Sequence, residues 1–145
     1  MNNILLIILV ACGGVAIAVQ PSINARLAQK IGSIESSMVS FTVGAIALFL
    51  VAMSIGKGNL RNITAAPWWE LTGGFCGAFF VTMTIIGVPR IGTAAVMAIA
   101  LAGQLTTAAM LDQFGLFGMR QISLTPLRGM GIALLFIGAV LVVRK

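Results

Sequence analysis

Long apolar runs separated by short polar segments set the pattern of this chain. A helix needs about 17 to 25 apolar residues to cross a hydrocarbon layer about 30 Å thick. Five runs reach that length, and they predict helices at about residues 4–28, 34–55, 69–88, 93–111 and 127–143. We therefore expect an all-α integral membrane protein whose five transmembrane helices form a single domain over residues 1–145.

The segments between these runs hold residues that end helices or suit a membrane surface. Gly32 and Gly92 lie in two short breaks, and Pro89 precedes the second of them. Trp68 and Trp69 suit the boundary between lipid and water, where an indole ring is half buried and half hydrated. These residues support the expected helix boundaries.

Composition places the chain in a bilayer, because 59% of its residues are hydrophobic and only 8% are charged. The net charge of +6 would raise the question of nucleic acid in a water-soluble protein. Here the basic residues stand singly between apolar runs and form no basic face. We therefore expect the lipid bilayer and a small-molecule substrate as partners, and no nucleic acid.

The basic residues are shared almost evenly between the two sides that five spans define. Four lie on the side of the N-terminus and five on the other: Lys57, Arg61, Arg120 and Arg128 against Arg26, Lys30, Arg90, Arg144 and Lys145. An excess of Lys and Arg in short loops normally fixes orientation. Its absence indicates that copies insert both ways up, although a partner subunit or the first helix alone is an alternative means of orientation.

Copies of opposite orientation can pair as an antiparallel homodimer of ten helices. Such a pair has the inverted-repeat arrangement on which many secondary transporters alternate access between two sides. Helices associate in lipid through small residues that allow close approach. Gly73 and Gly77 form such a GxxxG step, which serves either a dimer interface or packing within one subunit.

Polar residues inside the bilayer are costly and point to function. Gln20 and Asn24 are four residues apart on one face of the first span, and Pro21 between them frees the carbonyl of Ile17. We expect Gln20 and Asn24 to contact a polar substrate and Pro21 to act as a hinge. An ordinary proline kink with amides bonded to neighbouring helices is the alternative.

The remaining polar candidates for substrate contact differ in their expected depth in the bilayer. Gln104 lies roughly 16 Å from Thr93 along a helix, close to the midplane, and Thr107 shares its face. Arg26 lies roughly 33 Å from Ile4, at the far interface, where it contacts substrate only if the helix tilts or the cavity is hydrated. Ser40 belongs to a hydroxyl-bearing face of the second span, which lines a pore or bonds back to its own backbone. These four complete the predicted substrate-binding set.

The acids are few, and each lies near the end of a predicted span. Asp112 is the first candidate for coupling transport to protons and Glu35 the second, but either instead caps a helix or meets an interfacial arginine. Cys12 and Cys76 fall within spans, where a lone cysteine packs as a small hydrophobe. Leu9 to Cys12 resembles a lipobox, yet no basic residue precedes it and the apolar run continues, so we expect an uncut helix.

Two motifs resemble a known family. They are Gln20-Pro21-Ser22-Ile23-Asn24-Ala25 and, later, Gln104-Leu105 with Leu111-Asp112-Gln113-Phe114-Gly115-Leu116-Phe117-Gly118. They are similar to the YdcZ-type small inner-membrane proteins of the drug/metabolite transporter superfamily. That resemblance implies a bacterial inner-membrane location and half of a ten-helix transporter. The related small multidrug resistance exporters carry a membrane-embedded glutamate in their first helix, where this chain has Gln20 and Asn24.

The leading hypothesis is a small-solute transporter that works by alternating access as an antiparallel homodimer. An uncharged or weakly polar solute suits amides among apolar and aromatic walls, to which four side chains contribute: Phe41, Phe75, Phe79 and Phe80. A passive dual-topology ion or anion channel and a non-transporting membrane subunit are the alternatives. No nucleophile–base pair, cofactor motif or metal-ligand set stands out in the sequence, so we expect no enzyme, no cofactor and no metal.

Overall fold

The computed structural model describes residues 2–144 and consists of helices joined by turns and loops. Five of these helices are long and apolar enough to cross a membrane, which confirms the expected all-helical membrane fold. Their bounds are α1 Asn3–Ile31, α2 Ser33–Ile55, α3 Gly73–Ile91, α4 Thr93–Phe114 and α5 Pro126–Val143. Three short 3₁₀ helices complete the chain: η1 Leu60–Ala65, η2 Trp68–Thr72 and η3 Leu116–Gly118.

Most helix ends lie beyond the apolar runs that predicted them. α1 continues past residue 28 to Ile31, because Gln29 and Lys30 are good helix formers and the helix ends only at Gly32. α3 continues through Pro89, which therefore does not break the helix. A proline in a last turn removes one hydrogen bond from the helix, and few later turns remain to be disturbed.

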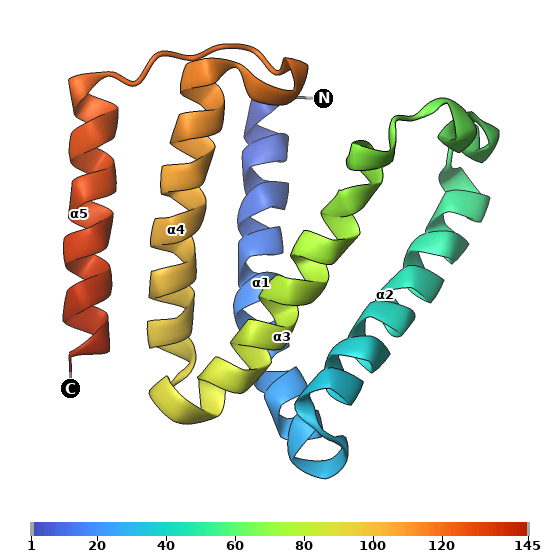
Figure 1. Ribbon diagram of the computed structural model, residues 1–145, viewed down its shortest axis with the longest axis horizontal. Helices are drawn as coiled ribbons and strands as arrows, with labels where there is room; N and C mark the ends of the chain where they lie inside the picture. The colour runs from blue at the N-terminus through green and yellow to red at the C-terminus, as the bar shows by residue number, and fades with distance from the viewer. Residues whose placement is uncertain (1, 145) are drawn as a thin grey trace. The chain divides into compact units, whose positions relative to one another are not determined.

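The chain divides into two compact units, one ending at Pro89 and the other beginning at Arg90. In the first unit, α1 and α2 are close at the Gly32 turn and diverge away from it (Figure 1). α3 contacts α2 through a hydrogen bond of 2.9 Å from Thr82 Oγ1 to Ser37 Oγ. A Cβ added at Gly77 would lie 3.2 Å from Phe41 Cζ, so the missing side chain allows this close approach.

Single glycines make two of the helix connections. Gly32 has φ 99° and ψ 156° between α1 and α2, and Gly92 has φ 87° and ψ 155° between α3 and α4. This backbone region is essentially restricted to glycine. The flanking residues match as well, because Lys30-Ile31-Gly32-Ser33 and Arg90-Ile91-Gly92-Thr93 both read basic, isoleucine, glycine, hydroxyl. The same turn is thus used twice in one chain.

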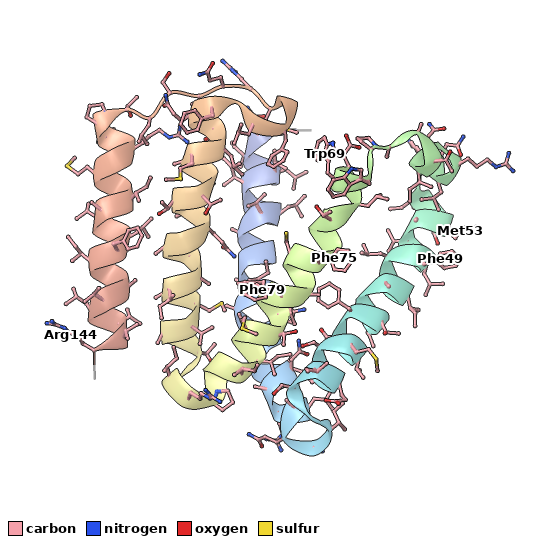
Figure 2. All side chains as sticks on the ribbon, viewed as in Figure 1. Phe49, Met53, Trp69, Phe75, Phe79 and Arg144 are labelled. Carbon is pink, nitrogen blue, oxygen red and sulfur yellow. The ribbon has the colours of Figure 1, made fainter. Side chains whose placement is uncertain are left out.

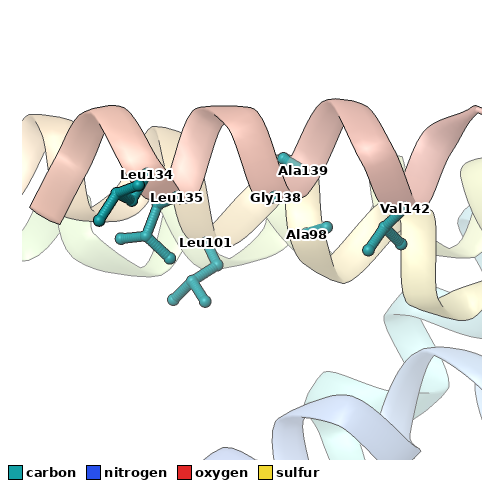
Figure 3. A pocket seen from close by; sticks show the side chains of 7 residues that line it. All are labelled: Ala98, Leu101, Leu134, Leu135, Gly138, Ala139 and Val142. Carbon is teal, nitrogen blue, oxygen red and sulfur yellow. The ribbon is translucent and has the colours of Figure 1, made fainter.

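In the second unit, α4 and α5 lie side by side along most of their length (Figure 1). Their contact is built on alanines, with Ala102, Ala109 and Ala139 buried. Beside it runs an apolar groove of about 330 Å³, shown in Figure 3, and its lining residues are Ala98, Leu101, Leu134, Leu135, Gly138, Ala139 and Val142. Small side chains therefore give this helix pair both a close contact and a hollow flank.

Few residues are fully buried, as expected of a helix bundle whose outer surface faces lipid. Leucine, isoleucine and phenylalanine side chains are mostly exposed, whereas four buried residues are polar: Asn24, Ser36, Ser37 and Thr84. In a water-soluble protein this distribution would be inverted. The polar interior identifies where function is to be sought.

Candidate functional site

Amides from α1 and hydroxyls from α2 and α3 meet inside the first unit. This amide–hydroxyl cluster comprises Gln20, Asn24, Ser36, Ser37, Ser40 and Thr82. Asn24 Nδ2 donates to Ser40 Oγ at 3.0 Å, and Gln20 Nε2 donates to the same oxygen at 3.4 Å. The two amides expected on one face of α1 therefore converge on a single hydroxyl of α2.

A backbone carbonyl of α1 also bonds to α2, next to the two amides. Ser36 Oγ donates to the carbonyl oxygen of Asn24 at 2.7 Å, and both residues are buried. Pro21 is among the most completely buried residues of the chain. Pro21 and Asn24 lie about one turn apart on α1, and Ser36 on α2 bonds the second of them, so this is a place where α1 contacts α2. A rearrangement of α1 here would have to exchange these hydrogen bonds for others.

Hydroxyls of the cluster take two roles that the sequence left open. Ser37 Oγ donates to the backbone of Ser33 at 3.0 Å, which is the expected back-bonding within a helix. Ser36 bonds across to α1, and Ser40 accepts from two side chains. The hydroxyl face of α2 is therefore bonded to α1 at Ser36 and Ser40.

Three members of the cluster were absent from the predicted substrate-binding set: Ser36, Ser37 and Thr82. Thr82 Oγ1 bonds Ser37 Oγ at 2.9 Å and lies 2.8 Å from the carbonyl oxygen of Ala78, so it joins α3 to the cluster. In the sequence, the only sign of this role is that the hydroxyl of Thr82 lies within an apolar run of the third span. Its partner on another helix could not be read from spacing within one helix.

The remaining substrate candidates lie outside this cluster. Gln104 and Thr107 are exposed on α4 in the second unit, and Arg26 is exposed near the end of α1. The hydroxyl of the neighbouring Thr106 bonds back to Ala102. Contact of Gln104, Thr107 and Arg26 with substrate therefore stays a prediction.

Asp112 forms an ion pair with an arginine of the following helix. Its Oδ2 lies 2.5 Å from Arg128 Nη2, and the two side chains are 33% and 37% exposed. Asp112 is in the last turn of α4 and Arg128 in the first turn of α5. Each charge is at the helix end where the macrodipole disfavours it, so pairing offsets both penalties.

The residues after Asp112 fold into a cap around this pair. Gly115 ends α4 in the left-handed conformation. Gln113 Oε1 accepts the backbone N–H of Leu124 at 2.5 Å, and Gln121 Nε2 donates to the carbonyl of Gln113 at 2.8 Å. The segment from Leu111 to Gly118 therefore positions the connection between α4 and α5. This favours a structural role for Asp112 over proton coupling.

Exchanging the charges of Asp112 and Arg128 provides a test. Asp112→Asn is expected to destabilise the protein by about 0.5–1 kcal/mol, because the pair is partly exposed and screened. Asp112→Arg combined with Arg128→Asp should restore stability, since each charge then suits its helix end. Unfolding in detergent, followed by circular dichroism, measures both. If Asp112 also couples protons, Asp112→Asn will remove the pH dependence of flux, which a purely structural role leaves in place.

The second coupling candidate is at the start of α2. Glu35 is exposed in the first turn, where a carboxylate interacts favourably with the helix dipole. Its side chain folds back over Gly32, into the space that a Cβ there would occupy. The position suits stabilisation of the turn.

The predicted GxxxG packing step on α3 has one occupied and one open position. Gly77 faces Phe41 of the same chain, whereas Gly73 faces open space.

Comparison with known proteins identifies the family of this chain. The sequence model of the DMT_YdcZ family, described as "Putative inner membrane exporter, YdcZ", matches residues 5–141. The chain is 31% identical to Inner membrane protein YdcZ of Escherichia coli (strain K12) over 153 aligned positions, covering 100% of this chain and 99% of that protein. No solved structure gives a significant match. The family resemblance and the inner-membrane location are thereby confirmed, and this chain belongs to the YdcZ family of multi-pass inner-membrane proteins with a role in membrane transport.

Proposed function

We propose that the protein exports a small, uncharged organic solute by alternating access, as an antiparallel homodimer. The amide–hydroxyl cluster is the observation that carries the proposal. Polar side chains within lipid-spanning helices are costly and are retained where they serve substrate pathways. Gln20, Asn24 and Ser40 form such a group on helices whose outer surfaces are apolar.

The chemistry of the cluster favours a neutral substrate. Each amide has a carbonyl oxygen that can accept a hydrogen bond, and Ser40 can donate its hydroxyl hydrogen. The cluster contains no acid or base, so it offers no counter-charge to an ion. A solute with a hydroxyl or amide group could exchange hydrogen bonds with Asn24 and Ser40 as it enters. Phe41, which packs against Gly77 on the same helix face as Ser37, supplies an apolar neighbour.

Two features support pairing of opposite copies. The balance of four basic residues against five gives little orientation preference. The groove between α4 and α5 presents alanine and glycine, which permit another helix to approach closely in lipid (Figure 3). The conformational exchange between the two members of the pair then opens the path to each side in turn.

Asn24→Leu tests the substrate site. Hydrogen bonds between membrane helices contribute about 0.6 kcal/mol on average and at most about 1.7, so the variant should remain folded. Flux should nevertheless be lost, because a leucine cannot bond either substrate or Ser40. The measurement is counterflow of a panel of hydroxyl- and amide-bearing neutral solutes in liposomes, beside detergent melting curves.

A matched pair on α2 controls for the loss of a hydroxyl. Ser40→Ala removes the acceptor shared by both amides, whereas Ser54→Ala removes an exposed hydroxyl bonded only to the carbonyl of Leu50. Only Ser40→Ala should reduce flux. Steady unitary currents in planar bilayers would identify a channel instead, and absence of flux for every solute would identify a non-transporting subunit.

A further inference from the structure

A cavity of about 870 Å³ lies at the end of α2, away from the amide–hydroxyl cluster. It is formed by the last turns of α2 and the loop that leads into η1, within the first unit. Its volume is within the range of sites that bind small molecules, about 300–1,000 Å³. The family and the proposed transport path leave this cavity unassigned.

The two walls of the cavity differ in chemistry. Phe49, Ala52 and Met53 form an apolar wall, and Figure 2 labels Phe49 and Met53 one turn apart on α2. Asn59 and Arg61 contribute the polar wall. A ligand that fills the cavity therefore has an apolar part and a polar part.

Arg61 supplies the charge of the polar wall. Both oxygens of Asn59 already accept hydrogen bonds within the loop. Its side-chain Oδ1 accepts from the backbone N–H of Arg61 at 3.0 Å, and its backbone carbonyl accepts from the N–H of Asn62 at 3.1 Å. Within residues 2–144, Arg61 makes no ion pair. Lys57 is in the same loop, and the chain has no acid between Glu35 and Glu70. The site is therefore cationic and complements an anion.

Its position matches the boundary of the bilayer. α2 ends at Ile55, and Trp68 and Trp69 begin η2 after the loop. Tryptophans gather at the level of lipid headgroups, where basic side chains meet lipid phosphates. We propose that this cavity binds an anionic phospholipid, with its phosphate on Arg61 and an acyl chain against Phe49, Ala52 and Met53.

Lipid retention by the full-length protein tests the site. The protein is purified in detergent with a mixture of phosphatidylglycerol and phosphatidylcholine, and native mass spectrometry counts the lipids that stay bound. Wild type should retain phosphatidylglycerol preferentially. Arg61→Gln should lower its retention about fivefold, the effect of one basic residue at a lipid surface. Ala52→Phe should lower it comparably by filling the apolar wall.

Matched variants distinguish lipid binding in this cavity from nonspecific attraction of anionic lipid to the basic protein. Arg90→Gln removes one exposed charge at the end of α3, and Ala45→Phe adds the same bulk two turns earlier on the exposed face of α2; neither residue lines the cavity. Both should bind as wild type. The proposal is overturned if Arg90→Gln loses as much lipid as Arg61→Gln, if phosphatidylcholine binds equally, or if millimolar inorganic phosphate displaces the lipid. Flux is not a readout, so this result is independent of the proposed function.

Discussion

Cysteines introduced at Asn62 and at Gln29 are each expected to react, in part of the population, with an impermeant reagent outside intact cells. Both positions are exposed and uncharged, so the balance of basic residues is unchanged. Five spans put the two positions on opposite sides of the membrane. With little charge bias to select one orientation, about half of the copies should present each position outward. Cys12 and Cys76, both exposed, are first replaced by alanine.

A charge-shifted variant is the control for this labelling. Lys57→Gln with Arg61→Gln leaves two basic residues on the side of the N-terminus against five on the other. The side with more Lys and Arg should then stay cytoplasmic, so only the cysteine at position 62 should react. Dual insertion is contradicted if the unshifted protein already labels at one position alone. Dimerisation of the shifted variant should fall in parallel, because its copies all point the same way.

Alanine at either single-glycine turn is expected to destabilise the fold. Gly32→Ala and Gly92→Ala place a Cβ in a backbone region essentially limited to glycine, at a cost of about 1–3 kcal/mol each. At Gly32 the Cβ also meets the Glu35 carboxylate, while at Gly92 it meets nothing within 4 Å. Since Glu35 is exposed and its side chain is flexible, it should move aside. The two variants should therefore lose similar stability, measured by denaturant unfolding in detergent.

Gly103→Ala is the matched control in this series. Gly103 is within α4, has no positive φ and would place its Cβ in open space. Alanine there should be neutral or stabilise by up to about 1 kcal/mol, since glycine is the poorer helix former. Equal losses at positions 32, 92 and 103 would show that the turn conformation is not the cause. A much larger loss at 32 than at 92, relieved by Glu35→Ala, would assign the cost to the collision.

The helices were predictable because lipid imposes length and composition on them directly. An apolar run of sufficient length must be helical to satisfy its backbone hydrogen bonds, so all five spans could be placed. The exact ends of the helices were harder to predict from the sequence. Lys30 and Arg90 are polar enough to end an apolar run, yet each continues its helix to the glycine that stops it.

The candidate site was predictable only along single helices. Gln20 and Asn24 share a face by their spacing, and the structure places both against Ser40. The partnership of Thr82 with Ser37, 45 residues apart, depends on how α3 lies on α2. For Asp112, the sequence left a coupling role and an arginine partner both open, since a terminal carboxylate suits either. Its ion pair with Arg128 depends on the intervening loop.

The two glycine turns follow the first and third helices, whereas the longer connections follow the second and fourth. If each of the five helices crosses the membrane once, both tight bends belong to one membrane surface and both longer loops to the other. A pair of oppositely inserted copies would then offer each compartment one set of bends and one set of loops. A protease or antibody directed at the loops would find the assembly equally accessible from either compartment, with no outer and inner face to tell apart.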